Sequence, residues 1–448
     1  MVINLLKPEI INLIRNKDYK SIKEAISDWQ PGEILDLLTS LPDEEQIIFF
    51  RLLPKQQAAD VFSLLDPDDQ MGIIEKLKEE KVKVVLNEMD PDDRTAFFEE
   101  IPSPVMLKLL NLLSPKERKD TLKLLGYPED SVGRLMTPDY VKIGQKWTVE
   151  MALKHIRKYG KDAETIDVIY VVDENNKLVD CINLKKIILS DPMQQIETIM
   201  DYHYVSLSPY DDREKAVQLM QKVDVFVLPV VGSDGVLLGI VTADDVLDVA
   251  QEEATEDIQK SASIEPLEIS YTKSSPFLLY RKRVIWLLVL LLADFLSSGV
   301  IAAFSGVLQA FIVLSFFIPV LIDSGGNTGT QSATLIIRGL ALGEIDFKQW
   351  WKILLKEIGV GLLLGITLGF IVFLRGYFWK GNTEVAFVIG LSMIVLVIWA
   401  NLIGSMLPLA LSKFRIDPAV VSGPFITSIV DASGLFIYFY IAKLILHV

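Results

Sequence analysis

The pattern of apolar and polar positions along the chain changes at about residue 276. Before this point apolar residues come in short groups separated by charged ones, whereas residues 277–448 contain five long apolar stretches. A helix needs roughly 20 apolar residues to cross the hydrocarbon core of a bilayer. The stretches lie near 284–304, 308–337, 351–374, 385–411 and 420–446. We therefore predict a multidomain chain in which a soluble part precedes a five-span α-helical transmembrane domain over 277–448.

Residues 1–130 contain an internal repeat of a helix-start motif. Four prolines, each followed within two residues by an acid, recur at spacings of 25, 24 and 24: Pro42, Pro67, Pro91 and Pro115. Proline at the first helical position loses no hydrogen bond, and acidic residues there favour the positive end of the helix. A repeat of 24 residues has room for two short helices, and such pairs are stable only when they stack. The sequence therefore predicts an α-solenoid N-domain over 1–130.

Residues 131–250 alternate between predicted strands and helices, twice over. The segments 169–177 and 228–235 both have the pattern of a strand that enters a turn, and they start 59 residues apart. In the second copy a strand leads into a helix capped by Thr242. This duplication resembles the CBS domain, whose tandem α/β pairs are regulatory modules that often bind adenine nucleotides. The resemblance makes Thr242 and Asp245 candidate ligands of the ribose and phosphates of ATP, whereas the first copy has Asn183 and Lys186 at these positions.

Charge is unevenly distributed along the chain. Residues 1–276 carry 32 basic and 51 acidic side chains, and residues 277–448 carry 12 basic and 8 acidic ones. The net charge of the whole chain is −15. An acidic surface repels nucleic acid and attracts cations, so we expect no nucleic acid as a partner. The one cysteine, Cys181, excludes an internal disulfide, and it has no neighbour at the spacing of a zinc site.

Basic residues next to the predicted spans indicate the orientation in the membrane. If the first span starts inside, nine of them lie on the cytoplasmic side and three outside. The N-terminus lacks the uninterrupted apolar core and cleavage site of a signal peptide. We predict a multi-pass protein of the plasma (inner) membrane, with the N-terminal domains in the cytoplasm and the C-terminus outside. Residues 251–276 are predicted to form an acid-rich helical connector between the two parts.

Three aspartates fall inside the predicted spans: Asp294, Asp323 and Asp431. A charge at bilayer depth is costly, so such a residue faces a pore, a partner or a helix seam. Asp431 lies mid-span with no basic residue at its depth in another span, which favours a permeating cation; a protonated acid that hydrogen-bonds another helix is the alternative. We expect Asp294 to be solvated near the cytoplasmic end of its span. Asp323 either caps a helix before the glycines that follow it or lines the pore.

A glycine-rich polar run, 324–332, lies inside the second predicted span. Such a run loosens a helix and lets another backbone come close, and its exposed carbonyls are tolerated only against protein or water. We therefore expect this segment to line a conduit, although close packing alone would also explain the glycines.

The chain closely resembles the MgtE magnesium channel family. The resemblance rests on the segments 325–334, 338–341 and 417–419, on the helix around Asp431, and on the order of N-domain, tandem CBS domains, connecting plug helix and five spans. It implies a homodimer with one pore on the two-fold axis, lined by the second and fifth spans, where Asp431 attracts hydrated Mg²⁺. The pore-lining positions that it implies are Gly325, Gly326, Asn327 and Thr427.

In that family cytosolic Mg²⁺ binds between the N-domain, the CBS domains and the plug helix and holds the pore shut. The positions that match here are all acidic: Asp60, Asp92, Glu214, Asp224, Asp245, Asp248, Glu253, Glu256, Asp257 and Asp417. Independently of the resemblance, acidic surfaces repel one another when divalent ions are scarce and are bridged when they are plentiful. We therefore expect the transported ion to close the pathway.

Other functions remain open on the residues alone. Hydrated Mn²⁺ or Co²⁺ would suit the same carboxylates, and a channel is not distinguished from a coupled carrier. A CBS sensor with a membrane anchor would need neither the acids within the spans nor the polar glycine run. The sequence has no nucleophile–base pair, Walker lysine loop or catalytic metal cluster, so we do not expect an enzyme.

Overall fold

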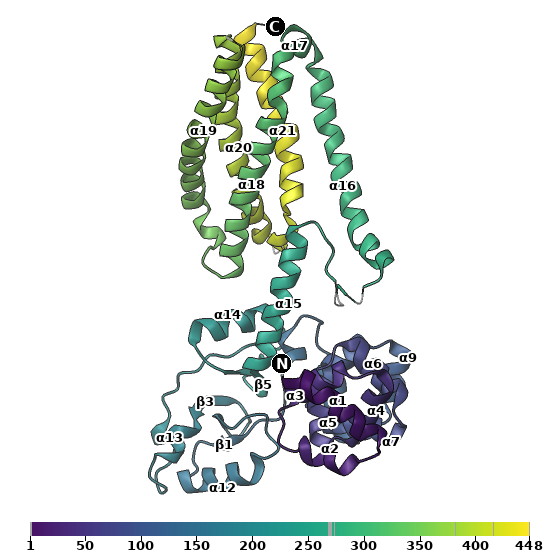
Figure 1. Cartoon of the computed structure of the whole chain (residues 1–448). Coiled ribbons are helices and arrows are strands. Elements are labelled where there is room, and N and C mark those ends of the chain that lie inside the picture. Colours follow the sequence, from purple (N-terminus) through teal and green to yellow (C-terminus); the bar gives the residue numbers. More distant parts are fainter. Residues whose placement is uncertain (1, 268–270, 273, 381, 415, 448) are drawn as a thin grey trace. The chain divides into compact units, whose positions relative to one another are not determined.

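The computed structural model describes residues 2–267, 271–272, 274–380, 382–414 and 416–447 (Figure 1). They form two compact units, Met1–Ala250 and Gln251–Val448, termed unit 1 and unit 2. The boundary lies within helix α15 (Ala243–Ser261). The predicted connector is therefore helical over 251–261, while residues 268–270 and 273 of it lie outside the described range.

Unit 1 begins with short helices that start where the repeat predicts. Helix α4 begins at Asp43, directly after Pro42, and α6, α8 and α10 begin at Pro67, Pro91 and Pro115. One further helix lies between each of these starts and the next, so each repeat holds a helix pair. The bounds are α1 (Val2–Arg15), α2 (Tyr19–Ala25), α3 (Pro31–Ser40), α4 (Asp43–Leu52), α5 (Lys55–Ser63), α6 (Pro67–Lys76), α7 (Glu79–Glu88), α8 (Pro91–Glu100), α9 (Ser103–Leu110) and α10 (Pro115–Leu124).

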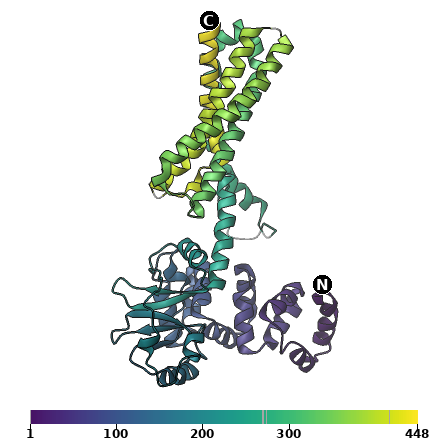
Figure 2. The same cartoon turned by 90° about the vertical axis from the view of Figure 1, so that its left-hand side faces the viewer.

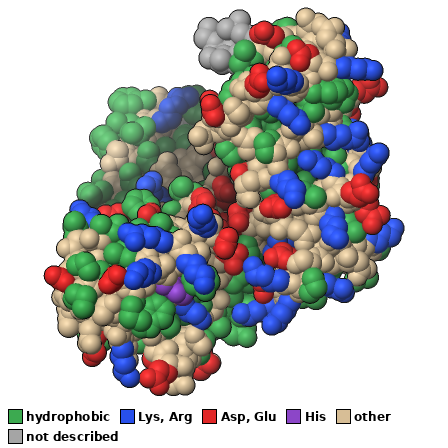
Figure 3. Space-filling model, turned by 90° about the horizontal axis from the view of Figure 1, so that it is seen from below, with side chains coloured by type: hydrophobic (Ala, Val, Ile, Leu, Met, Phe, Trp, Pro, Cys, Tyr) green, Lys and Arg blue, Asp and Glu red, His purple; other side chains and the backbone are tan. Residues whose placement is uncertain are grey.

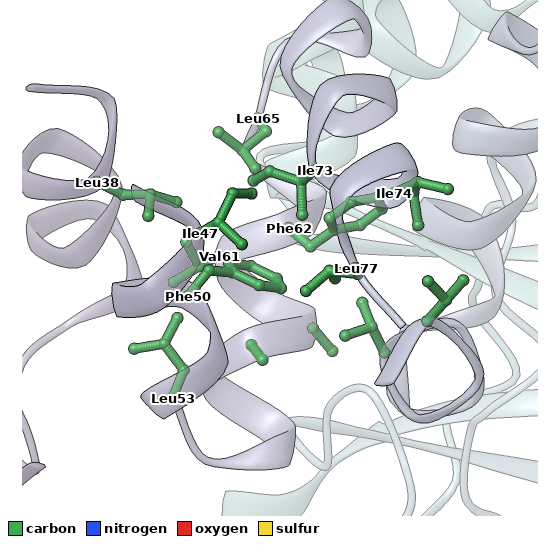
Figure 4. Packing of buried hydrophobic residues seen from close by; sticks show 14 of the residues in the cluster. Leu38, Ile47, Phe50, Leu53, Val61, Phe62, Leu65, Ile73, Ile74 and Leu77 are labelled. Carbon is green, nitrogen blue, oxygen red and sulfur yellow. The ribbon is translucent and has the colours of Figure 1, made fainter. Parts of the chain in front are cut away.

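Helices α1 to α9 share one apolar core, part of which Figure 4 shows. Phe62 of α5 lies between Phe50 of α4 and Phe97 of α8, with ring centroids 6.3 Å and 5.3 Å away. Aromatic pairs at such separations and tilted angles add to the gain from apolar burial. The core therefore runs from one repeat into the next, as stacking of helix pairs requires.

The rest of unit 1 is a duplicated α/β module. After α11 (Val132–Leu135), the first copy comprises β1 (Lys142–Gly144), α12 (Val149–Tyr159), β2 (Val168–Val172), β3 (Leu178–Asn183) and α13 (Leu184–Ile188). The 3₁₀ helix η1 (Ile196–Ile199) leads to the second copy, α14 (Arg213–Val223), β4 (Val227–Val231), β5 (Leu237–Thr242) and α15. The strand orders are β1-β2-β3 and β4-β5.

The two copies match in detail at an offset of 59 residues. Both antiparallel pairs shift register at the same place, between Val171 and Val172 in the first and between Val230 and Val231 in the second. In the second copy a parallel bridge from Leu207 to Val230 takes the place of β1. The duplication inferred from the sequence is thus confirmed, including its irregularities.

Unit 2 contains five helical segments long and apolar enough to cross a membrane, the predicted number, within the residues that the structure describes. Their elements are α16 (Pro276–Ala303), α17 (Ser305–Ala310), η2 (Ile312–Phe317), α18 (Ile318–Ala341), η3 (Phe347–Gln349), α19 (Trp350–Lys380), α20 (Thr383–Lys413), η4 (Pro418–Val420) and α21 (Gly423–Leu446). Helices α18 to α21 pack together, and α16 lies along α21 (Figures 1 and 2). The predicted start of the second span at residue 308 is wrong, because the backbone at Phe311 leaves the helical conformation (φ −133°, ψ 73°) and separates α17 from η2.

Glycines bring α18 close to its neighbours. The expectation that they loosen this helix is wrong, since α18 is continuous over its 24 residues. A Cβ atom on Gly404 of α20 would collide with the main-chain carbonyl of Gly329, and one on Gly326 would lie 2.9 Å from Thr427 of α21. Small residues at such positions let helix backbones approach each other in a membrane.

Candidate functional site

Asp431 lies in α21 and is surrounded electrostatically by other acids. The charged groups that act on it are Asp294 of α16 and Asp323 of α18. Its Oδ1 atom is buried and has no hydrogen-bond partner within the described residues, where no lysine or arginine forms an ion pair with it either. A carboxylate oxygen in this position needs a positive partner, because a buried unpaired charge is strongly unfavourable.

Asp294 is joined to the same helix. Ser428 of α21 donates a hydrogen bond to Asp294 Oδ1 over 3.2 Å. Because α16 already begins at Pro276, Asp294 lies well inside the helix. The predicted position of Asp294 near the cytoplasmic end of its span is therefore wrong, whereas its side chain is exposed in the single chain and its solvation stays a prediction. The apolar pattern placed the span from about residue 284 and did not indicate which side of α16 faces α21.

Asp323 and Asn327 lie one turn apart on the exposed side of α18. The Asn327 side-chain amide donates a hydrogen bond to Asp323 Oδ2 over 3.2 Å, and both side chains are exposed in the single chain. The N-cap of α18 is Phe317, so the alternative that Asp323 caps a helix is wrong. This polar side of a membrane-spanning helix is typical of a surface that meets water or another chain.

The other predicted pore-lining residues lie in helix contacts of the single chain. Gly325 and Gly326 are buried, and a Cβ atom on Gly325 would collide with Leu396 of α20. The Thr427 hydroxyl donates to the main-chain oxygen of Gly423 over 3.0 Å. The glycines therefore have a packing role, and the lining of a pore by this set stays a prediction.

A further acid in the spans was missed by the sequence interpretation. Glu357 of α19 accepts a hydrogen bond from Ser332 of α18 over 2.9 Å, and the Asn401 amide of α20 lies 3.4 Å from its main-chain oxygen. The Ser332 hydroxyl also lies 3.3 Å from the Asn401 carbonyl oxygen. These contacts connect three spans. Glu357 falls inside the predicted stretch 351–374, so a complete count of acids in the spans would have found it.

Unit 1 holds a second and larger group of acids, between its helical domain and its CBS copies. Figure 3 shows acidic side chains in the hollow between these two parts. We term this group, whose charges act on one another, the acidic cluster: Asp60, Asp90, Asp92, Asp93, Glu164, Asp244, Asp245 and Asp248. Four members were predicted. Of the others, Asp90, Asp93 and Asp244 lie within two residues of predicted ones, and Glu164 carried no signal in the sequence.

Burial and mutual repulsion raise the pKa values of these carboxyl groups. Burial is the largest cause, followed by neighbouring acids, and together they raise the pKa of Asp90 to about 6, of Asp245 to about 7 and of Glu164 to about 8. Asp92 is only 6% exposed, and burial followed by the charge of Asp245 raises its pKa well above the ordinary value. The ionised cluster is therefore short of positive charge.

The nearby arginine is engaged in structural contacts. Arg94 is buried, and its guanidinium donates to the main-chain oxygens of Leu86 and Met89 and to the hydroxyl of Thr121 over 2.9–3.3 Å. Arg94 of α8 thus connects its own helix with α7, with Met89 directly after α7, and with α10. Within the part of the chain that the structure describes, no three acidic, histidine or cysteine side chains are positioned to hold a metal ion. The acids are gathered, but a coordination sphere would require them to move.

The predicted residues of the second CBS copy outside this cluster lie on α14, directly after it and at the end of β5. Glu214 accepts a hydrogen bond from Gln218 over 3.2 Å, and Asp224 ends α14 in the left-handed conformation at φ 57°. The Thr242 hydroxyl donates to Asp245 Oδ2 over 2.8 Å, which joins the two predicted nucleotide ligands to each other. The ligand roles of these residues stay predictions.

Three of the acids predicted in the connector and in the loop before α21 lie around one lysine. Lys260 forms ion pairs with Glu256 and Asp417, and its Nζ lies 2.6 Å from Asp417 Oδ2. Burial, and next the charge of Asp417, raises the pKa of Asp257, which Lys260 partly offsets. Glu253 lies one turn before Asp257 on α15. The Glu256–Lys260 spacing of four residues on a helix was a readable signal for this pair.

Comparison with known proteins supplies the family. The magnesium transporter MgtE of Thermus thermophilus is 40% identical over 437 residues, which are 97% of either chain. The chain belongs to the MgtE family of magnesium transporters. The MgtE of Bacillus subtilis is 31% identical over 438 residues and covers 98% of this chain. The family description "Divalent cation transporter" matches residues 318–441, the MgtE intracellular N domain matches 29–130, and the CBS domain matches 132–190 and 196–252.

Two solved structures each match a little over half of the chain. The cytosolic domain of the Mg²⁺ channel MgtE in complex with ATP is 35% identical, and the match covers 55% of this chain and all of that one, with a TM-score of 0.53. The soluble part of a magnesium transporter is 27% identical, with 56% and 99% covered and a TM-score of 0.54. The predicted family and the three-part MgtE fold class are confirmed. The predicted domain boundaries at residues 130, 250 and 276 stay predictions.

Proposed function

We propose that the chain carries Mg²⁺ across the plasma membrane along a pathway that passes Asp431. The observation that supports this most directly is the buried, unpartnered Oδ1 atom of Asp431 within a membrane-spanning helix, near Asp294 and Asp323. Mg²⁺ prefers oxygen ligands and gives up its water reluctantly, so carboxylates attract it through its hydration shell and still release it. The relatives that span nearly the whole chain are named as magnesium transporters, which supports this choice of ion.

The working unit is a homodimer, with the pathway between two copies of α18 and α21. In the single chain only 6% of the most apolar window of α16 is buried, and the Asp323–Asn327 side of α18 is exposed. Polar groups at this depth need protein or water around them, and a second copy would provide both and bring a second Asp431. The basic residues that flank the spans favour a cytoplasmic unit 1 and a C-terminus outside.

Unit 1 regulates the pathway by binding cytosolic Mg²⁺ at the acidic cluster. At low Mg²⁺ the cluster repels itself and its two parts separate; at high Mg²⁺ bound ions neutralise it and favour the compact, closed form. Several weak sites acting together give a steep response. The remaining predicted acids, Glu214, Asp224, Glu253, Glu256, Asp257 and Asp417, belong to the same gating system. ATP is a further ligand at Thr242 and Asp245, supported by the solved relative that holds ATP.

The proposal is tested with the purified chain in liposomes and planar bilayers. We expect Mg²⁺ current down its gradient, suppressed from the side of unit 1 when Mg²⁺ there is stepped from micromolar to millimolar. Mn²⁺ and Co²⁺ in place of Mg²⁺ distinguish a magnesium pathway from a general divalent one. Absence of any divalent flux under a gradient would overturn the transport proposal, and flux indifferent to internal Mg²⁺ would overturn the gating part alone.

A further inference from the structure

The contact between the end of α15 and the loop before α21 contains its own cation. Lys260 lies in the last turn of α15, with its Nζ 2.6 Å from Asp417 Oδ2 and in an ion pair with Glu256 one turn earlier. The side chain of Lys260 is only 25% exposed, that of Asp417 38% and that of Glu256 31%. Asp257 adds a third negative charge within electrostatic range of both Lys260 and Asp417. The ammonium group is therefore held among carboxylates.

We propose that Lys260 is a positioning residue whose ammonium group holds α15 against the loop 417–422, so that this contact forms without a divalent ion. The inference rests on the proposed function, in which Glu256, Asp257 and Asp417 are candidate Mg²⁺ ligands. It changes the role of these acids, because the positive charge that joins them is the side chain of Lys260 and not a bound ion.

The arrangement around Asp417 indicates that this contact is built for a fixed partner. Asp417 caps η4, where its Oδ1 accepts the main-chain N–H of Ala419 over 2.8 Å, and its Oδ2 faces Lys260. Both oxygens of the carboxylate are thus satisfied by protein donors, unlike Oδ1 of Asp431. A carboxylate that already accepts two hydrogen bonds has less capacity left for a hydrated ion.

Two contacts follow this lysine along the chain, one to the loop 417–422 and one to α16. The Ser263 hydroxyl donates to Ser422 Oγ over 2.5 Å, and both residues are buried. Glu265, two residues further on, pairs with the buried Lys282 at the start of α16 over 3.2 Å. A lysine tethered this close has a high effective concentration at the carboxylates, and a chelator does not remove it. Mg²⁺ would have to displace it in order to bridge the same oxygens.

Disulfide trapping across this contact tests the proposal without relying on transport. Ser263→Cys and Ser422→Cys are introduced together in a Cys181→Ser background of the full chain, because their hydroxyls are already in contact. We expect the pair to cross-link under mild oxidant in EDTA as fast as in millimolar Mg²⁺. Adding Lys260→Gln should slow cross-linking in EDTA by at least about threefold, since three carboxylates then repel one another, and millimolar Mg²⁺ should restore the rate.

Lys260→Arg is the matched control, since it keeps the charge and should cross-link in EDTA like the parent. Three results would overturn the proposal: a parent pair that cross-links only with Mg²⁺, a Lys260→Gln rate equal to that of the parent in EDTA, or a slowed Lys260→Gln rate that Mg²⁺ does not restore. Failure of the proposed transport function would instead appear as absent Mg²⁺ flux in liposomes, with cross-linking unaffected. The two failures are therefore distinguishable.

Discussion

Unit 1 and the membrane spans of unit 2 both contain carboxylates without matching positive charge, but they hold them in different ways. In unit 1 eight acids share the repulsion, and the raised pKa values of Asp90, Asp245 and Glu164 show that protons can relieve it. In the membrane spans of unit 2, Asp294, Asp323 and Asp431 lie singly on three separate helices, and glycines pack α18 closely against α20 and α21. A cluster of interacting acids that can change its protonation suits the sensing of an ion's concentration. Single acids on closely packed helices suit the passage of that ion.

The largest effect expected from this contrast follows removal of one charge in unit 2. Asp431→Asn keeps the size of the side chain but removes the charge that attracts a hydrated cation. We expect Mg²⁺ uptake into liposomes to fall at least about tenfold, because no other acid in the described spans has an unpartnered buried oxygen. Fluorescent Mg²⁺ indicators inside the vesicles provide the measurement.

Asp346→Asn is the matched control for this variant. Asp346 caps η3 outside the long helices, and asparagine caps a helix equally well, so uptake should stay at the parental level. If Asp431→Asn transports as well as this control, the assignment of the pathway to α21 is wrong. The acids in the spans would then have no demonstrated part in ion passage.

The corresponding change in unit 1 should alter regulation and leave transport capacity intact. Asp92→Asn with Asp245→Asn removes two of the proposed Mg²⁺ ligands and also relieves part of the repulsion in the acidic cluster. The loss of ligands has the larger effect, because the raised pKa values of both carboxyl groups already limit the negative charge that they contribute. We expect the internal Mg²⁺ needed for half-maximal closure to rise several-fold while uptake at low internal Mg²⁺ is unchanged.

Bilayer recordings with stepped internal Mg²⁺ measure both quantities for this double variant. Asp36→Asn, an exposed change in α3 outside the cluster, serves as the control. If the double variant closes at the same internal Mg²⁺ concentration as the parent, the acidic cluster has a structural role and no part in sensing Mg²⁺.

The sequence predicted more of unit 1's architecture than of its site. The proline and acid repeat located helix starts to within a residue, since capping and the first turn are decided by neighbours in the chain. The cluster was only half found, because Glu164 meets the N-domain acids through a domain contact that no local pattern encodes. In unit 2 the apolar pattern predicted five spans, but it could not show that Asp294 faces Ser428, because burial in lipid leaves all sides of a helix apolar.

The pH dependence of unit 1 offers a third test of the comparison. A carboxyl group whose pKa is higher in the folded than in the unfolded state binds protons more readily when folded. Folded stability is therefore greatest at low pH and is lost as pH rises from the ordinary value near 4 through the raised values of about 6 to 8. Without divalent ions we expect unit 1 to unfold at a lower temperature at pH 8 than at pH 6.

Scanning calorimetry of the purified full chain in EDTA measures this difference, and Mg²⁺ at pH 8 should reduce it by supplying the missing charge. Glu164→Gln removes the group with the highest of these values and should narrow the gap between the two pH values. An unfolding temperature that is equal at pH 6 and pH 8 in EDTA would contradict the picture of a self-repelling cluster.

The smallest expected effect concerns the seam between α16 and α21. Asp294 contacts the helix of Asp431 through Ser428, yet it is exposed in the single chain, so it adds to the local negative field without being its centre. We expect Asp294→Asn to lower uptake only about two- to threefold, since Asp294 Oδ1 already accepts a hydrogen bond from Ser428, whereas Asp431 Oδ1 has no partner within the described residues. Ser428→Ala should have a similar or smaller effect, and Ser298→Ala, whose hydroxyl contacts only the Asp294 main chain, should have none. A loss as large as that of Asp431→Asn would mean that the pathway depends on a pair of acids from two helices, and the contrast between single acids in unit 2 and shared acids in unit 1 would have to be given up.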